Sequence, residues 1–240
     1  MAFVMSFLGA LLPAKLAALI DYRRSKYRTF FPFGGPFNGQ TFRAELVRTL
    51  IELAEIEQIV ETGTYRGTTT EWFAQFELPV FSAEISARMA AFSRMRLADW
   101  PNVRIENRPS TTALQGWSSD PSVSSRRTFF YLDAHWMNYL PLLEELEIIA
   151  SRFRSFVIVI DDFKVVGDDD YLYDDYGPGK VLELEYLKPI LPQFAAVYFP
   201  SLPGRWETGA RRGCVVLTND RVIAETCDEM PSLKRVDQAT

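Results

Sequence analysis

Short apolar runs recur along the chain, separated by segments in which apolar and polar residues mix. The segments between the earlier runs are mostly long enough to hold a helix. The segment between the last two runs, residues 200–214, has no helical periodicity, so these runs are expected to pair as an antiparallel hairpin at one edge. The pattern predicts an α/β fold with a doubly wound, seven-stranded, mostly parallel sheet that ends in this hairpin. The runs are residues 59–60, 80–81, 103–105, 129–132, 156–160, 197–199 and 215–217.

The N-terminal region has a different pattern. Residues 1–20 are apolar but contain a proline and a lysine and lack a basic leading segment, which argues against a transmembrane span or a signal peptide. We expect an amphipathic helix that packs on the domain or joins two copies in a homo-oligomer, with a membrane-surface helix as the alternative. Residues 21–43 predict an arm that covers the mouth of a site or simply packs on the core. This organisation separates a helix and arm, 1–45, from a main domain, 46–240.

Composition limits the function classes. With 240 residues, of which 48% are hydrophobic and 14% aromatic, the chain can bury a full core. The formal net charge of −5 makes nucleic acid an unexpected partner, because phosphate binding needs a basic face. The two cysteines, Cys214 and Cys227, lack metal-ligand spacing. They predict a reduced, cytoplasmic protein without a structural disulfide.

The segment around the first apolar run predicts a strand, a tight turn and a helix. Gly63 and Gly67 allow the turn and a close approach of the backbone to a ligand, and Thr68 or Thr69 can cap the helix. Ligands of open α/β sheets bind where a strand ends and its helix begins, and Glu61 stands at that point. The sequence over residues 58–70 is Gln-Ile-Val-Glu-Thr-Gly-Thr-Tyr-Arg-Gly-Thr-Thr-Thr.

Tyr65 indicates which ligand this turn accepts. Dinucleotide-binding turns follow the pattern Gly-x-Gly-x-x-Gly, which places a pyrophosphate at the helix N-terminus. Tyr65 replaces the second glycine, and a bulky residue there favours a smaller, cationic cofactor such as S-adenosylmethionine (SAM). Glu61 would then lie near the methionine ammonium. The alternative is an ordinary strand, turn and helix that bind no ligand.

Two residues after the next strands extend this cofactor hypothesis. Glu84 ends the second apolar run, where nucleotide-binding sheets place an acid that accepts hydrogen bonds from ribose hydroxyls. The alternative for Glu84 is an exposed glutamate at a strand end. Ser110 follows the third run and is expected to border the adenine.

Three carboxylates follow the fourth and fifth runs. Asp133 ends the fourth, and Asp161 and Asp162 end the fifth. Parallel neighbouring strands bring these ends together, so the three anions would meet beside the cofactor cleft. A hard divalent cation such as Mg²⁺ would offset their repulsion. In the alternative interpretation, one carboxylate caps a helix and another is solvated.

Three motifs together resemble the metal-dependent catechol O-methyltransferase-like family. They are Glu-Thr-Gly-Thr-Tyr-Arg-Gly-Thr-Thr from Glu61, Leu-Asp-Ala-His-Trp from Leu132 and Ile-Asp-Asp from Ile160. The family typically has Glu-x-Gly-x-Tyr-x-Gly-x-Ser, Leu-Asp-His-Trp and a later Asp-Asn. The Asp-x-His element is also similar to macrocin O-methyltransferase and cephalosporin hydroxylase-like proteins. The resemblance covers roughly residues 55–165 and implies the Rossmann-like fold of class I SAM-dependent methyltransferases.

The resemblance also implies roles for single residues. Asp133, Asp161 and Asp162 would bind the metal, which we expect to be Mg²⁺ or a similar divalent cation. Glu84 would bind the ribose of SAM. Together with the turn residues, the expected cofactor-binding set is Glu61, Gly63, Tyr65, Gly67, Thr68, Glu84, Ser110 and Asp133.

Two departures from the family pattern affect the chemistry. Ala134 is inserted before the histidine, and the lysine that acts as general base in the catechol enzymes is replaced, with Met137 and Asn138 following the tryptophan. The candidate replacement bases are His135 and Lys164. Histidine has the more suitable unperturbed pKa, about 6.5. His135 can equally be a structural hydrogen-bonding residue.

The leading hypothesis is methyl transfer from SAM to a hydroxyl of a small molecule, with the metal activating that hydroxyl. The acidic, aromatic loop 167–178 is expected to be a substrate lid or a solvated turn. Arg211 and Arg212 would bind an acidic substrate group or remain on the surface. The alternatives are a metal-dependent hydroxylase-like enzyme on the same fold and a non-catalytic or glycan-linked module, suggested by the Asp-x-Asp pattern at 168–170.

Overall fold

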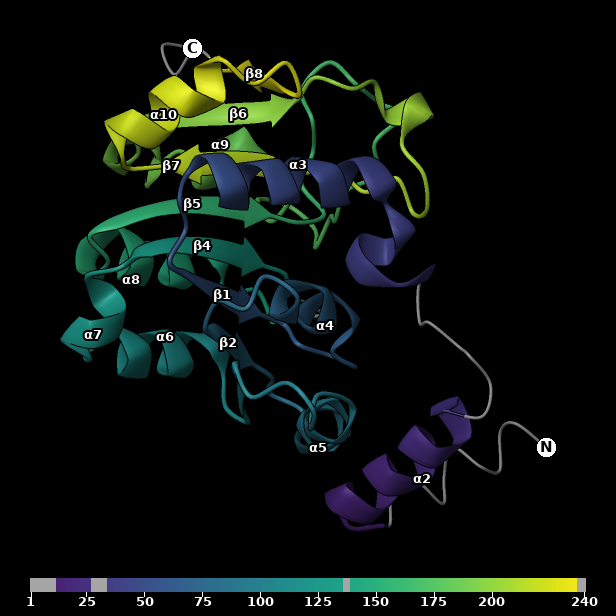
Figure 1. Ribbon diagram of the computed structural model, residues 1–240. Coiled ribbons are helices and arrows are strands. Elements are labelled where there is room, and N and C mark those ends of the chain that lie inside the picture. Colours follow the sequence, from purple (N-terminus) through teal and green to yellow (C-terminus); the bar gives the residue numbers. More distant parts are fainter. Residues whose placement is uncertain (1–11, 27–33, 136–138, 237–240) are drawn as a thin grey trace.

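The computed structural model describes residues 12–26, 34–135 and 139–236. The strands of this part of the chain are β1 (Gln58–Thr62), β2 (Val80–Ala83), β3 (Val103–Glu106), β4 (Arg127–Leu132), β5 (Ser155–Ile160), β6 (Ala196–Pro200), β7 (Val215–Thr218) and β8 (Leu233–Arg235). They form one sheet in the order β3-β2-β1-β4-β5-β7-β6-β8 (Figure 1). Strands β1 to β5 are parallel, while β7 runs antiparallel to both β5 and β6. The predicted mostly parallel α/β sheet with a C-terminal antiparallel hairpin is confirmed.

The edge of the sheet differs from the prediction. An eighth strand, β8, pairs antiparallel with β6, so the β6–β7 hairpin lies inside the sheet. The sequence pattern missed β8 because it has three residues, of which Lys234 and Arg235 are exposed. A short, charged edge strand protects a sheet from pairing with other chains but shows no apolar run.

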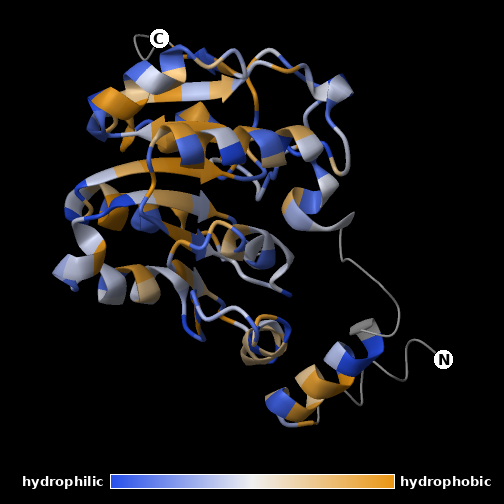
Figure 2. Ribbon diagram, in the orientation of Figure 1, coloured by the Kyte–Doolittle hydropathy of each residue, from blue (hydrophilic) through white to orange (hydrophobic). Residues whose placement is uncertain are grey.

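Helices cover both faces of the sheet, which explains the continuous apolar character of the central strands. On one face lie α3 (Thr41–Leu53), α4 (Thr68–Ala74) and α10 (Arg221–Asp228). On the other lie α6 (Ser110–Ser118), α7 (Pro121–Ser124), α8 (Leu142–Arg152) and α9 (Leu184–Leu187). Figure 2 shows the apolar strands between these two helical layers. Cys214 and Cys227 are buried in the first layer's core and free, as expected.

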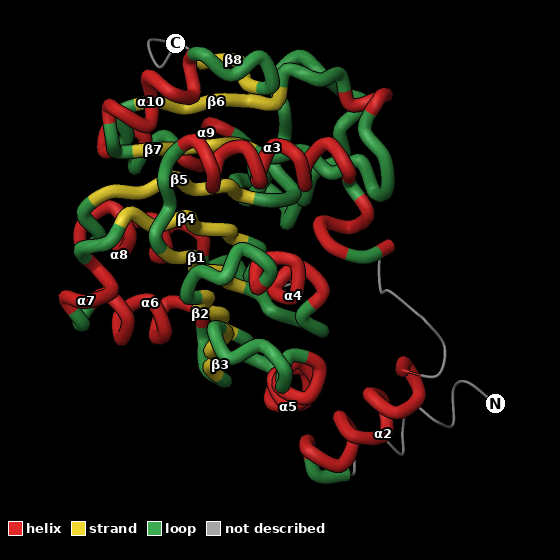
Figure 3. Tube along the Cα trace, viewed as in Figure 1, coloured by secondary structure: helices red, strands yellow, loops and turns green. Residues whose placement is uncertain are grey.

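The N-terminal helix, α2 (Ala14–Lys26), lies apart from the sheet and packs on α5 (Ala87–Arg96) (Figure 3). The rings of Tyr22 and Phe92 meet edge to face at 5.5 Å, and Asp21 pairs with Arg88 at 2.6 Å. Packing on the domain is therefore confirmed for this helix, whereas residues 1–11 lie outside the described residues. None of the helices in the described ranges is both long and apolar enough to cross a membrane. The homo-oligomer stays a prediction.

The described part of the arm leads directly into α3. A 3-10 helix, η2 (Pro36–Gly39), buries Phe37 against the rings of Trp72 and Tyr131. The boundary drawn between residues 45 and 46 falls inside α3. Glu207, from the β6–β7 connection, accepts the second and third backbone amides of α3, with distances of 3.2 Å to Phe42 N and 3.1 Å to Arg43 N. This interaction places the arm beside the β6–β7 connection.

Candidate active site

A cavity of about 640 Å³ lies at the carboxyl ends of the parallel strands. Ligands of open α/β sheets bind at this edge. We name its two parts by their residues. The turn end comprises Gly63, Thr64, Tyr65, Thr68, Glu84, Ser86 and Ser110, and the acid end comprises Asp133, His135, Asp162, Asp174 and Arg212. Gly35 and Asn38 of the arm and Ala210 of the β6–β7 connection also line the cavity.

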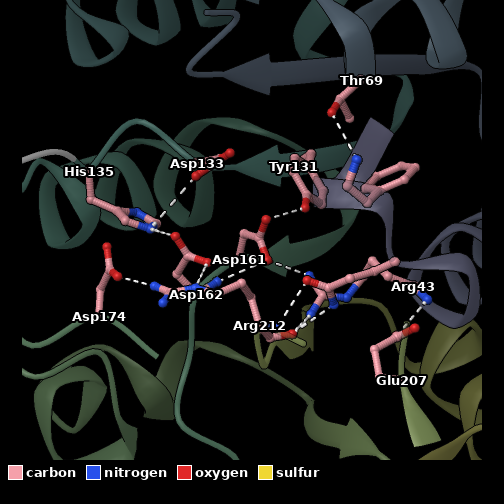
Figure 4. Close-up of polar contacts among 12 residues, drawn as sticks. Arg43, Thr69, Tyr131, Asp133, His135, Asp161, Asp162, Asp174, Glu207 and Arg212 are labelled. Atoms are coloured by element: carbon pink, nitrogen blue, oxygen red, sulfur yellow. Dashed lines mark hydrogen bonds and ion pairs between the residues drawn. The ribbon is translucent and has the colours of Figure 1, made fainter. Parts of the chain in front are cut away.

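The turn end is built by unusual backbone conformations. Gly63 has a φ of 90°, and a side chain there would collide with the carbonyl of Asp133, so only glycine allows β1 and β4 to approach so closely. Gly67, with a φ of 75°, is the N-cap of α4 and has no side-chain cap. The prediction that Thr68 or Thr69 caps α4 is therefore wrong. Thr68 is the first helical residue, and the Thr69 hydroxyl accepts the Phe37 amide at 3.2 Å (Figure 4).

Glu84 is held rigidly at the turn end. One carboxylate oxygen accepts the backbone amide of Tyr65 and the other that of Ser86, each at 2.7 Å. Burial raises the pKa of Glu84, although both hydrogen bonds favour the charged form. A carboxylate oxygen has room for more than one donor. Glu84 can therefore accept further hydroxyl hydrogens from a ligand in the cavity.

Glu61 does not line the cavity. Its carboxylate accepts hydrogen bonds from Thr70 Oγ1 at 2.5 Å and from Ser82 Oγ at 2.6 Å, and it is 1% exposed. Ser82 is in turn bonded to the Thr64 hydroxyl at 2.6 Å. Burial raises the pKa of Glu61 to about 7. The residue expected to face a ligand instead supports the turn from beneath.

Three side chains at the acid end form a compact cluster. Asp133, His135 and Asp162 each offer one ligand atom, and these atoms lie within 4.8 Å of one another. His135 Nε2 is 3.8 Å from the nearest oxygen of each aspartate (Figure 4). Although the Asp133 side chain is 36% exposed, desolvation by the surrounding protein and the charges of Asp161 and Asp162 raise the pKa of Asp133 above its usual range. An ionised Asp133 is thus unfavourable without a counter-charge, which a bound cation would supply.

The cluster fits a divalent cation. The His135 side chain is 2% exposed, and in the described part of the chain its Nε2 atom has no hydrogen-bond partner. A buried polar atom without a partner is rare in folded proteins, and a bound ion is one explanation. Two carboxylate oxygens and one imidazole nitrogen are a suitable donor set for a divalent metal.

Asp161 does not belong to this cluster, which corrects the predicted ligand set. Its side chain is 2% exposed and pairs with Arg43 Nη1 at 2.6 Å, while its other oxygen accepts the Tyr131 hydroxyl at 2.6 Å. These contacts satisfy the charge of Asp161 within the protein. His135, predicted as a base or a structural residue, takes the third place in the cluster.

Arg212 and the acidic loop close the acid end. Arg212 Nε lies 2.5 Å from Asp162 Oδ1, and its guanidinium also pairs with Asp174. The backbone amide of Asp174 donates to the carbonyl of Asp162 at 2.9 Å. The loop therefore reaches the cavity through Asp174, and Arg212 is engaged by two carboxylates of the protein itself.

Two further sequence candidates lie outside the cavity. Lys164 Nζ pairs with Glu183 at 2.8 Å and lies over the ring of Tyr173, and Glu183 raises the pKa of this lysine. These contacts do not suit a general base at neutral pH. Asp168 of the Asp-x-Asp pattern is engaged by the protein itself, since its carboxylate accepts the amides of Asp170 in the same loop and of Gly204 in the β6–β7 connection.

Sequence reasoning missed three contributors to the site. Asn38, Arg43 and Asp174 lie outside the predicted motifs, and no local pattern connects them to the site. The segments that contain them, the arm and the acidic loop, were predicted only to cover the mouth of the site. The sequence signal that could have indicated Arg43 is its helical spacing with Leu46 and Leu50, which places a charged residue on the apolar face of α3.

Comparisons with known proteins give matches in structure alone. No protein-family model matches the chain, and no curated protein matches its sequence. The O-methyltransferase from Bacillus cereus, solved with SAH, has a TM-score of 0.57 at 16% identity over 87% of this chain and 92% of that chain. The O-methyltransferase TomG from Streptomyces achromogenes, involved in tomaymycin synthesis and solved with SAM, has a TM-score of 0.54 at 19% identity over 73% and 78%. Such likeness establishes the fold alone, so the chain has a Rossmann-like α/β fold that it shares with these two O-methyltransferases.

Proposed function

We propose that the protein is a SAM-dependent O-methyltransferase that uses a divalent cation and methylates a hydroxyl of a small molecule. The main support is the placement of the turn end and the acid end in one cavity, at the sheet edge where this fold binds ligands. Two structural matches carry SAM or SAH, which supports an adenosyl ligand at this edge. The net charge of −5 supports a small-molecule acceptor over a nucleic acid.

The turn end is proposed to bind SAM. Gly63 lines the cavity and would bring the backbone close to the ligand, whereas Gly67 does not line it and faces the C-terminal part of α5. Glu84 would accept the ribose hydroxyls while two amides hold its carboxylate in place. Tyr65, 40% exposed, and Ser110 border the same space. SAM would supply an activated methyl group on a sulfonium, and the protein aligns an acceptor oxygen with it.

The acid end is proposed to hold the cation and the acceptor. Asp133, His135 and Asp162 would be the ligands, with Mg²⁺ or Mn²⁺ the expected metal. When bound, such a cation supplies Lewis acidity, which lowers the pKa of an acceptor hydroxyl. Asp174 and Arg212 flank this end and help to exclude water from it.

The proton of the acceptor is not expected to leave through Lys164, which is paired with Glu183 outside the cavity. His135 cannot serve as a free base while its Nε2 atom holds a cation. Activation of the acceptor hydroxyl would therefore depend on the cation, which would lower the pKa of that hydroxyl enough for its proton to pass to solvent water, in contrast to the lysine base of the catechol enzymes that the sequence resembles. A catechol acceptor is correspondingly disfavoured.

The test is transfer of a labelled methyl group from SAM to a panel of phenolic, catecholic and sugar hydroxyls, with Mg²⁺ or with excess EDTA. We expect product with at least one class and its loss in EDTA. Unchanged transfer in EDTA would remove the metal from the proposal. A protein that binds neither SAM nor SAH would contradict the proposal as a whole.

A further inference from the structure

Arg43, in the first turn of α3, is a charged residue almost wholly enclosed by protein. Burial of a guanidinium is unfavourable unless its donors are satisfied. Arg43 Nη1 donates to Asp161 Oδ1 at 2.6 Å, and Nη2 donates to the carbonyl oxygen of Arg212 at 2.7 Å. The two arms of one planar group thus connect the end of β5 to the β6–β7 connection.

The first contact controls the backbone of Asp162. Asp161 Oδ1 accepts the backbone amide of Asp162 at 2.9 Å in addition to the Arg43 donor. Asp162 has a φ of 56°, in the left-handed region that residues other than glycine rarely adopt. The Asp161 carboxylate, held by Arg43, therefore stabilises the turn that directs Asp162 toward His135, with the oxygen and nitrogen 3.8 Å apart.

The second contact controls the side chain of Asp162. The carbonyl of Arg212 accepts from Arg43 and also from Gln40 Nε2 at 2.8 Å, while the Arg212 amide donates to Gln40 Oε1 at 2.9 Å. With its backbone fixed, Arg212 donates from Nε to Asp162 Oδ1. This bond leaves Asp162 Oδ2 as the atom nearest His135 (Figure 4).

We propose that Arg43 is the positioning residue of the metal cluster, because it orients Asp162 from both sides, through Asp161 and through Arg212. The inference rests on the proposed function in requiring that the cluster bind a divalent cation. Among the described residues, the Arg43 guanidinium bonds to Asp161 and Arg212 and not to the three residues of the cluster, so it acts through its two partners. Arginine suits this role because its rigid fork presents two donors in fixed directions, which a lysine ammonium does not.

The test measures Mn²⁺ affinity by electron paramagnetic resonance and SAH affinity by calorimetry on the full chain. For Arg43→Met we expect Mn²⁺ affinity to fall about 10- to 100-fold, as for loss of a residue that orients a metal ligand. SAH affinity should stay within about threefold. Arg48→Met is the matched control, since Arg48 lies on the same helix but stacks on Trp72 and Phe76 away from the cluster. Both affinities of this variant should equal those of the wild type.

Arg43→Lys keeps the buried charge and guards against misfolding of Arg43→Met. We expect it to fold, to bind SAH normally and to lose Mn²⁺ affinity by an intermediate factor. Wild-type Mn²⁺ affinity in a folded Arg43 variant would overturn the inference and leave the proposed function intact. A wild-type protein that binds SAH but no Mn²⁺ would overturn the metal part of the proposed function, and the inference with it.

Discussion

The two ends of the cavity are constructed in different ways. The turn end uses backbone amides, glycines and one carboxylate from β1, β2 and the turns that follow them. The acid end combines charged side chains from the ends of β4 and β5, the acidic loop and the β6–β7 connection, braced by Arg43 from α3. Most residues of the turn end follow one predicted strand-turn-helix segment and the next strand, whereas those of the acid end come from segments that no local sequence pattern connects. A mutation at one end should therefore weaken ligand binding at that end and leave binding at the other end unchanged.

The largest effect is expected at the acid end, from Asp162→Asn. Asparagine tolerates the left-handed backbone but lacks the charge. We expect metal-dependent turnover to fall roughly a thousandfold, beyond the 10- to 100-fold typical for loss of an outer partner. Mn²⁺ titration and methyl-transfer assays would measure the loss. SAH affinity is the control and should stay within about threefold; an equal loss of SAH binding would mean that the two ends are not separable.

Glu61, beneath the turn end, should make the free energy of unfolding depend on pH. Its pKa is about 7 in the folded protein against 4.5 in the unfolded chain, because of burial. The folded state therefore binds the Glu61 proton more tightly than the unfolded chain does. The resulting stabilisation of the folded state is complete below pH 4.5 and is lost as the pH rises through 7. The free energy of unfolding is expected to change by roughly 3 kcal/mol between these two pH limits.

The variant Glu61→Gln tests this sign. It should be more stable than the wild type above pH 7, and the stability difference should shrink as the pH falls toward 4.5. Urea unfolding at pH 5 and pH 8 measures it. A difference between the two proteins that does not change with pH would show that Glu61 does not titrate in this range.

A smaller effect should follow at the turn end from Glu84→Gln. The variant loses a charged acceptor, and a hydrogen bond to a charged group contributes about 1.5–3 kcal/mol. We expect SAH affinity to fall roughly tenfold or more, measured by calorimetry. Mn²⁺ affinity should not change. Wild-type SAH affinity in this variant would exclude Glu84 from the adenosyl site.

The smallest effect is expected from Lys164→Met. Lys164 is more than one-third exposed and its ion pair with Glu183 lies on the surface, where such pairs contribute about 0–1 kcal/mol. Turnover should remain within about twofold of the wild type across pH 6–9. A large loss of turnover with an unchanged fold would restore Lys164 as a base and place the chemistry outside the acid end.

The same contrast explains what the sequence could predict. The positions of seven strands and of the first turn follow from local periodicity and from Gly63 and Gly67, and the predicted fold class is confirmed. Asp161 and Asp162 are adjacent and chemically alike, so no local pattern could distinguish them. Their positions relative to the metal cluster differ because Arg43, 118 residues earlier in the chain, pairs with Asp161 and not with Asp162. Long-range partners of this kind are not visible in periodicity or motif spacing.

The short elements show the same limit. β8 was missed because two of its three residues are charged, and its place depends on pairing with β6. Lys164 was proposed as a base from its nearness in sequence to Asp161, yet its side chain points to Glu183. Sequence distance is thus a poor guide to which side chains share a cavity, even when the sheet edge is assigned correctly.

Binding of SAH to the wild-type protein tests the central claim most directly. Calorimetric titration should show saturable binding with one site per chain, and Glu84→Gln should weaken it while Arg48→Met should not. Absence of binding at millimolar SAH, by a protein shown to be folded, would contradict the assignment of this cavity to an adenosyl methyl donor.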